Sequence, residues 1–139
     1  MAGKTITASV RLVDGLQVEA RARNHFFVLD EPANIGGSDT GMTPMEGLLS
    51  SLGACMTIIA KLFAKSKGIS LKDFRVELEG EGAPGVRPGF QDIRVKAFVK
   101  SDSPQEKIDE FMKFVERMCP VRDSIANGVR ITASAEVVS

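Results

Sequence analysis

Residues 43–65, TPMEGLLSSLGACMTIIAKLFAK, decide the fold because they predict one long helix that is apolar on nearly every side. Thr43 and Glu46 match the capping box that begins many helices, and Pro44 suits the first helical position. Lysines and Gly68 stand where such a helix would end. A helix that is apolar all round must be buried on most sides, and a chain of 139 residues offers little cover. We therefore expect this helix to pack against a second copy of the chain.

The residues before this helix predict three strands. Apolar and polar residues alternate over 6–12 and again over 16–22, which is the pattern of half-buried strands. Asp14-Gly15 between them is a strong hairpin signal. Asn24-His25 can form a second turn into a third strand at 26–30. The first third of the chain is therefore a β-meander.

The residues after the long helix predict two strands, two helices and a last strand. Ser103, Pro104 and Glu106 repeat the capping box, so a second helix begins there. Pro120 ends it near Cys119, because the residue before a proline is pushed out of helical geometry. The chain is thus expected to be one α+β domain over 1–139, in the order βββ-α-ββ-α-α-β. The later elements are expected at 74–80, 91–101, 104–118, 120–126 and 129–138.

The composition excludes several classes of function. Eighteen basic and eighteen acidic residues give a formal net charge of zero, so we expect neither nucleic acid nor a membrane surface as a partner. No apolar run approaches the roughly 18 residues of a membrane span, and the N-terminus lacks a signal-peptide pattern. The expected location is the cytoplasm. No set of residues has metal-ligand or phosphate-loop spacing, so we expect no metal and no cofactor.

One of the two cysteines, Cys119, stands where the second helix ends and a short helix begins. There it can cap the short helix and meet the positive end of the helix dipole. Free backbone N–H groups and nearby Arg122 would lower the pKa of its thiol further. A small buried residue at a helix junction explains the position equally well. Position alone leaves the two interpretations open.

The other cysteine, Cys55, lies inside the long helix among apolar residues, and position alone favours a core-filling role. Gly53 inside a helix marks either a close approach or a local break, and both would let another group come near Cys55. Glu46 is nine positions earlier, on the opposite side of a straight helix and about 13.5 Å away. Its capping role is sufficient; action on Cys55 would require a kink or contact across a dimer.

Two motifs together resemble the OsmC/Ohr family of thiol-dependent peroxidases: GGSDTGMTPMEGLLSSLGAC at 36–55 and MCPVRDSIANGVRIT at 118–132. The expected order of elements agrees with the family over essentially the whole chain. The resemblance implies an intertwined homodimer, in which strands wrap a long central helix of each subunit. It also implies two active sites at the subunit interface.

By the same resemblance, Cys55 would be the peroxidatic thiolate and Cys119 the resolving thiol. The thiolate would attack a hydroperoxide to give a sulfenic acid, which the second thiol converts to a disulfide. An external dithiol of lipoyl type would reduce that disulfide, and no metal, haem or flavin would be needed.

The chain departs from the family pattern at two points. Met45 stands where the best-studied members have a glutamate, and Glu46 matches the P-M-E variant of less characterised members instead. The family also uses an arginine from the N-terminal strands to activate the thiolate, but the hairpin turn here has none. Arg11, Arg21 and Arg23 are the nearby candidates.

Three hypotheses follow for the function. The first is thiol-dependent reduction of hydroperoxides, organic ones above all. The second is a non-catalytic dimer whose cleft binds a hydrophobic small molecule, which the missing arginine and the apolar helix favour. The third is a redox sensor that passes its disulfide to a partner protein.

Overall fold

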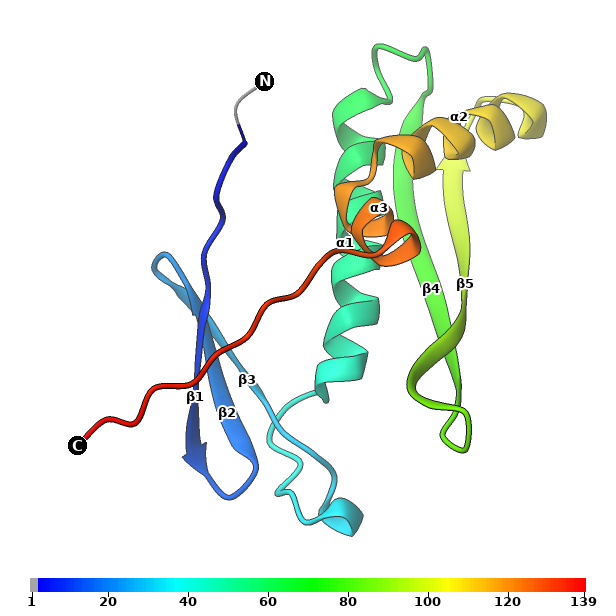
Figure 1. The fold of residues 1–139 in the computed structure, drawn as a ribbon. Helices are drawn as coiled ribbons and strands as arrows, with labels where there is room; N and C mark the ends of the chain where they lie inside the picture. The colour runs from blue at the N-terminus through cyan, green and yellow to red at the C-terminus, as the bar shows by residue number, and fades with distance from the viewer. Residues whose placement is uncertain (1–2) are drawn as a thin grey trace. The chain divides into compact units, whose positions relative to one another are not determined.

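The computed structural model describes residues 3–139 and is mixed α+β, which confirms the predicted fold class (Figure 1). It consists of two compact units, one ending at Ser50 and the other covering Ser51–Ser139. In chain order the elements are β1 (Ser9–Asp14), β2 (Gln17–Ala22), β3 (His25–Leu29), the 3-10 helix η1 (Ala33–Ile35), α1 (Pro44–Phe63), β4 (Leu71–Ala83), β5 (Arg87–Ser101), α2 (Gln105–Met118) and α3 (Pro120–Asn127).

The first unit holds the predicted meander, an antiparallel sheet in the order β1-β2-β3. Gly15 adopts a φ of +58° in the first turn, where a glycine carries no steric cost. The second turn begins one residue earlier than predicted, with Arg23 at a φ of 55°, and His25 is already the first residue of β3. The apolar side chains of Val10 and Phe27 on this sheet are exposed.

The loop between β3 and α1 is folded around the Asp30 side chain, which is 1% exposed. Its carboxylate accepts hydrogen bonds from the backbone N–H groups of Glu31, Ser38 and Thr40 and from the Thr40 hydroxyl, at 2.6–3.3 Å. Gly37 lies so close to this segment that a Cβ would stand 1.9 Å from the Glu31 carbonyl oxygen. The loop therefore has one tightly specified conformation.

The Asp30 carboxylate should make the stability of the chain depend on pH. The Thr40 hydroxyl and the Glu31 N–H hold the pKa of Asp30 below its usual range, although burial acts in the opposite direction. A carboxyl with a lowered pKa stabilises the fold above its ordinary pKa of about 3.9, and this contribution is lost as the pH falls through the lower folded value. We expect the melting temperature of the chain to decrease when the pH is lowered below about 4.

Asp30→Asn should flatten this pH dependence, measured by far-UV circular dichroism. Asp39→Asn is the matched control, because Asp39 is an exposed carboxyl of the same loop that accepts none of these hydrogen bonds. Equal pH slopes in the Asp30→Asn variant and the parent chain would contradict the assignment.

The start of α1 is the predicted capping box. The Thr43 N–H donates to Glu46 Oε1 at 2.8 Å, and the Glu46 N–H donates to Thr43 Oγ1 at 3.1 Å. After the helix, Gly68 adopts a φ of +69° and the Ile69 N–H donates to the Ala64 carbonyl at 2.8 Å, as at many glycine-terminated helices. Both ends of the long helix therefore follow from local sequence signals.

The chain itself buries only one side of α1. Leu52, Met56 and Ala60 are at most 5% exposed, whereas Ile58 and Leu62 are 58% and 68% exposed. By length and composition alone, α1 also meets the criterion for a membrane span, contrary to the expectation from the sequence. The core helix of a soluble protein meets the same criterion.

In the second unit, α1 from Ser51 onward lies along one face of the β4–β5 hairpin (Figure 1). Both strands extend beyond their predicted bounds, and pairing continues to Ala83 and Arg87 with register shifts around Gly82. α2 covers the other end of this core through one apolar stripe. The fully buried core residues are Leu52, Met56, Ala60, Ala64, Ile69, Ile108, Phe111, Val115 and Cys119.

Two predicted features are wrong. α2 begins at Gln105 with Pro104 as its N-cap residue, and the Ser103 hydroxyl accepts a hydrogen bond from the Ser70 N–H at 3.4 Å instead of capping the helix. The predicted strand at 129–138 is also absent, because this segment pairs with no strand among residues 3–139. A strand needs a neighbour to pair its backbone N–H and C=O groups, and the alternating pattern of this segment does not provide one.

Candidate thiol site

Cys119 lies at the junction of α2 and α3 and is fully buried. Its backbone is extended, with φ −79° and ψ 108°, because Pro120 follows it. Cys119 is the N-cap residue of α3, and its Sγ accepts the Arg122 N–H at 3.4 Å. The predicted capping role of this cysteine is therefore confirmed.

The fold brings the two cysteines together from distant parts of the sequence. Cys55 lies on α1, is half-buried, and packs against the core cluster that contains Cys119; both are free thiols. Burial raises the pKa of the Cys119 thiol, and the neighbouring Cys55 raises it further, while the Arg122 and Val121 N–H groups act in the opposite direction. The predicted lowering of the Cys119 pKa is wrong, because burial and Cys55 outweigh the helix terminus.

Two adjacent thiols resist carrying two negative charges, so such a pair keeps one proton over a wide pH range. The raised pKa of the Cys119 thiol favours its protonated form. The arrangement thus places two free thiols in one core cluster, Cys119 fully buried and Cys55 half-buried.

Gly53 marks a close approach and not a break in the helix. A Cβ at this position would lie 2.8 Å from Leu78 Cδ1 and 3.3 Å from Val76 Cγ2 on β4. The absence of a side chain lets α1 lie directly on β4, two residues before Cys55. The Thr57 hydroxyl donates to the Gly53 carbonyl at 2.8 Å, and α1 continues unbroken through this point.

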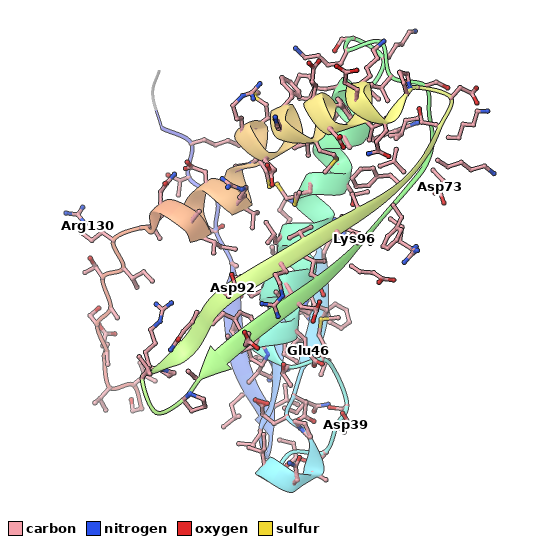
Figure 2. The ribbon with its side chains drawn as sticks, turned by 90° about the vertical axis from the view of Figure 1, so that its right-hand side faces the viewer. Asp39, Glu46, Asp73, Asp92, Lys96 and Arg130 are labelled. Atoms are coloured by element: carbon pink, nitrogen blue, oxygen red, sulfur yellow. The ribbon has the colours of Figure 1, made fainter. Side chains whose placement is uncertain are left out.

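Glu46 lies in the first turn of α1 and belongs to the capping box with Thr43 (Figure 2). No break of α1 separates it from Cys55, so the hypothesis of a kink at Gly47 or Gly53 has no support in the helix. A part for Glu46 in the chemistry stays a prediction.

The three candidate arginines lie in the first unit. Glu19 forms ion pairs with Arg11 at 3.6 Å and with Arg21 at 2.6 Å. The Arg21 guanidinium also lies 4.9 Å from the centroid of the Phe26 ring. Arg23 occupies the β2–β3 turn. Arg11 and Arg21 are thus held by partners on their own sheet.

A hollow of about 380 Å³ borders both cysteine segments, and only the apolar spacing of α1 could have pointed to it from the sequence. Met56, next to Cys55, lines it, and so does Arg122, whose N–H is bonded to Cys119. Its walls combine apolar side chains with charged ones, among them Asp92 of β5 (Figure 2). The apolar lining comes from Leu52, Met56, Phe90, Ile93, Val95 and Ile125.

The residues that carry the site lie within a family match. The model of the family described as OsmC-like protein matches residues 36–134, which include both cysteines and Glu46. The chain belongs to the OsmC-like family.

Relatives and solved structures agree with this assignment. A hydroperoxide reductase of Mycoplasma genitalium is 25% identical over 117 residues, covering 82% of each chain. An OsmC-like protein of Mycoplasma pneumoniae has the same fold, with a TM-score of 0.80 at 23% identity over 90% of this chain and 89% of its own. An organic hydroperoxide resistance protein of Legionella pneumophila has a TM-score of 0.70 at 20% identity over 90% and 91% of the two chains. The predicted OsmC-like fold is therefore confirmed.

Proposed function

We propose that this chain reduces hydroperoxides, organic ones in particular, through Cys55 and Cys119. The observation that carries the proposal is the packing of Cys55 against the core cluster that contains Cys119, inside the family match. The names of the relatives support a peroxide-related role, since two of them are called hydroperoxide reductase. The hollow beside Met56 and Arg122 offers space for the organic part of such a substrate.

In the proposed reaction the Cys55 thiolate attacks the outer oxygen of the hydroperoxide, and the O–O bond breaks. The substrate leaves as an alkoxide, takes a proton and becomes an alcohol, while Cys55 becomes a sulfenic acid. The Cys119 sulfur then attacks the Cys55 sulfur, and water leaves as the disulfide forms. A small external dithiol, of lipoyl type, returns two electrons and restores both thiols.

The remaining parts of the proposal concern assembly and surroundings. We infer a homodimer, because Ile58 and Leu62 on α1 leave an apolar face uncovered by the chain itself. A cytoplasmic location is also part of the proposal. Glu46 is carried over from the family motif as a third residue of the site. No metal or organic cofactor takes part in these steps.

The test is a thiol count after addition of a slight excess of cumene hydroperoxide to the reduced chain. Both thiols should disappear, the chain should lose the mass of two hydrogen atoms, and digestion should yield a Cys55–Cys119 linked peptide. Dilution of the protein should not change this result, since the bond lies within one chain. Two free thiols in a folded, peroxide-treated protein would refute the proposal.

A second candidate function rests on the same hollow. Its apolar lining and its volume of about 380 Å³ suit a small hydrophobic molecule, which a non-catalytic family member could carry. A bound molecule released by denaturing the purified protein, together with thiols that survive peroxide, would favour this function. A redox sensor would instead form a mixed disulfide with another protein, trapped with Cys119→Ser.

A further inference from the structure

We propose that the reducing thiol attacks the Cys55 sulfur of the disulfide, and that Cys119 leaves as a thiolate held by the first turn of α3. This inference rests on the proposed function and specifies its last stage. Either sulfur of a disulfide can be attacked in principle, and accessibility and the stability of the leaving thiolate decide between them.

Accessibility favours Cys55. An incoming thiolate must approach along the line of the S–S bond, and Cys119 is fully buried at the junction of α2 and α3. Cys55 is half-buried, so its sulfur is the more accessible of the two. A hollow large enough for a small thiol is lined by Met56, which follows Cys55, and by Arg122, whose N–H is bonded to Cys119; neither cysteine itself lines it.

Backbone N–H donors are available to a leaving thiolate at Cys119. Its Sγ accepts the Arg122 N–H at 3.4 Å, and the N-terminus of α3 places its positive end at the sulfur. Cys55 lies inside α1, where backbone N–H groups are already bonded along the helix. A thiolate released at Cys119 can therefore accept hydrogen bonds from backbone N–H groups, and Cys55 has no such free donors in α1.

The pKa of Cys119 in the reduced chain is raised, chiefly by burial, which opposes the release of a thiolate there. Burial and the neighbouring Cys55 thiol raise it, and the Arg122 and Val121 N–H groups lower it. During reduction Cys55 is part of a mixed disulfide and carries no charge, so its repulsion is absent. Burial and the N–H donors both remain, so the N–H groups offset part of the cost of burying a thiolate at Cys119.

The electrons and protons balance over two steps. A thiolate of the dithiol donates an electron pair to Cys55 Sγ, the S–S bond breaks, and the pair passes to Cys119 Sγ. The second thiol of the dithiol gives its proton to the Cys119 thiolate. The second sulfur of the dithiol, now a thiolate, then attacks the dithiol sulfur of the mixed disulfide. Cys55 leaves as a thiolate, and the dithiol becomes a cyclic disulfide.

Mapping of the first mixed disulfide tests the inference in the unmodified chain. The oxidised protein is mixed briefly with 2-mercaptoethanol, quenched with acid, alkylated and digested for mass spectrometry. We expect the adduct on Cys55 and the alkyl group on Cys119, in about tenfold excess over the reverse. Equal amounts, or an adduct mainly on Cys119, would overturn the inference and leave the proposed function intact. Failure to form any disulfide with peroxide would instead refute the proposed function.

A matched pair of variants tests the part played by the Arg122 N–H. Arg122→Pro removes both the N–H and the guanidinium, whereas Arg122→Ala removes only the guanidinium. Arg122 is the third residue of α3, so its N–H has no partner within the helix, although a proline there disfavours the helical conformation of Val121. Disulfide reduction should be about tenfold slower in the Arg122→Pro variant than in the Arg122→Ala variant. Equal rates in the two folded variants would exclude a role for the N–H, and if Arg122→Pro does not fold, the mapping decides alone.

Discussion

Cys55→Ser should abolish hydroperoxide reduction, lowering the rate by a factor of about 10³ or more. A serine hydroxyl does not ionise near neutral pH, and its oxygen cannot accept the peroxide oxygen as sulfur does. The substitution is nearly isosteric at a half-buried position on α1, so the fold should persist. Consumption of cumene hydroperoxide in the presence of dihydrolipoamide measures the effect.

Cys119→Ser is the control that separates the two thiols. This variant keeps the Cys55 thiol and should consume about one equivalent of peroxide, after which Cys55 remains a sulfenic acid that a dimedone probe can label. It should form no linked peptide within the chain. Sustained turnover by the Cys55→Ser variant would contradict the assignment of Cys55, and normal turnover by Cys119→Ser would contradict a resolving role for Cys119.

Phe111→Ala should destabilise the chain by about 3–5 kcal/mol. Phe111 belongs to α2, and its ring points into the core, where it is 3% exposed. It stacks on the Phe114 ring, with the two centroids 6.5 Å apart. Its removal leaves a cavity that backbone elements on several sides prevent from closing. Because the chain has neither Trp nor Tyr, unfolding is followed in guanidinium by far-UV circular dichroism at one protein concentration.

Phe98→Ala is the matched control for size and chemistry. The Phe98 ring is 37% exposed on β5, where the Arg75 guanidinium lies 4.2 Å from its centroid. Loss of this contact should cost only about 1 kcal/mol. Similar losses for both variants would mean that the core described around Phe111 does not dominate the stability of the second unit.

Sequence reasoning succeeded where the physical cause is local. The capping box of Thr43 and Glu46 and the proline after Cys119 act within a few residues, so helix starts and the N-cap cysteine could be predicted. Gly53 was recognised as exceptional because glycine inside a helix is costly. Its cause, the proximity of Leu78, became clear only from the packing of α1 on β4.

Sequence reasoning failed where contacts between distant residues decide the outcome. The predicted lowering of the Cys119 pKa considers only the helix terminus and nearby Arg122, but burial and Cys55 raise this pKa. Ser103 has the sequence of a cap, yet its hydroxyl accepts from Ser70, which lies far away in the chain. The pattern at 129–138 describes a strand, but a strand also requires a neighbour, which a one-dimensional pattern does not supply.

Because Cys119 lies at a helix junction, formation of the proposed disulfide would also crosslink separate helices of the second unit. In the proposed cycle, a bond from this junction to Cys55 ties α2 and α3 to the middle of α1 and closes a long loop that contains the whole β4–β5 hairpin. Such a crosslink removes conformations from the unfolded chain and is typically worth about 2–4 kcal/mol. The second unit would therefore be more stable in the disulfide state than in the dithiol state. The reductant would restore both the two thiols and the lower stability of the reduced chain.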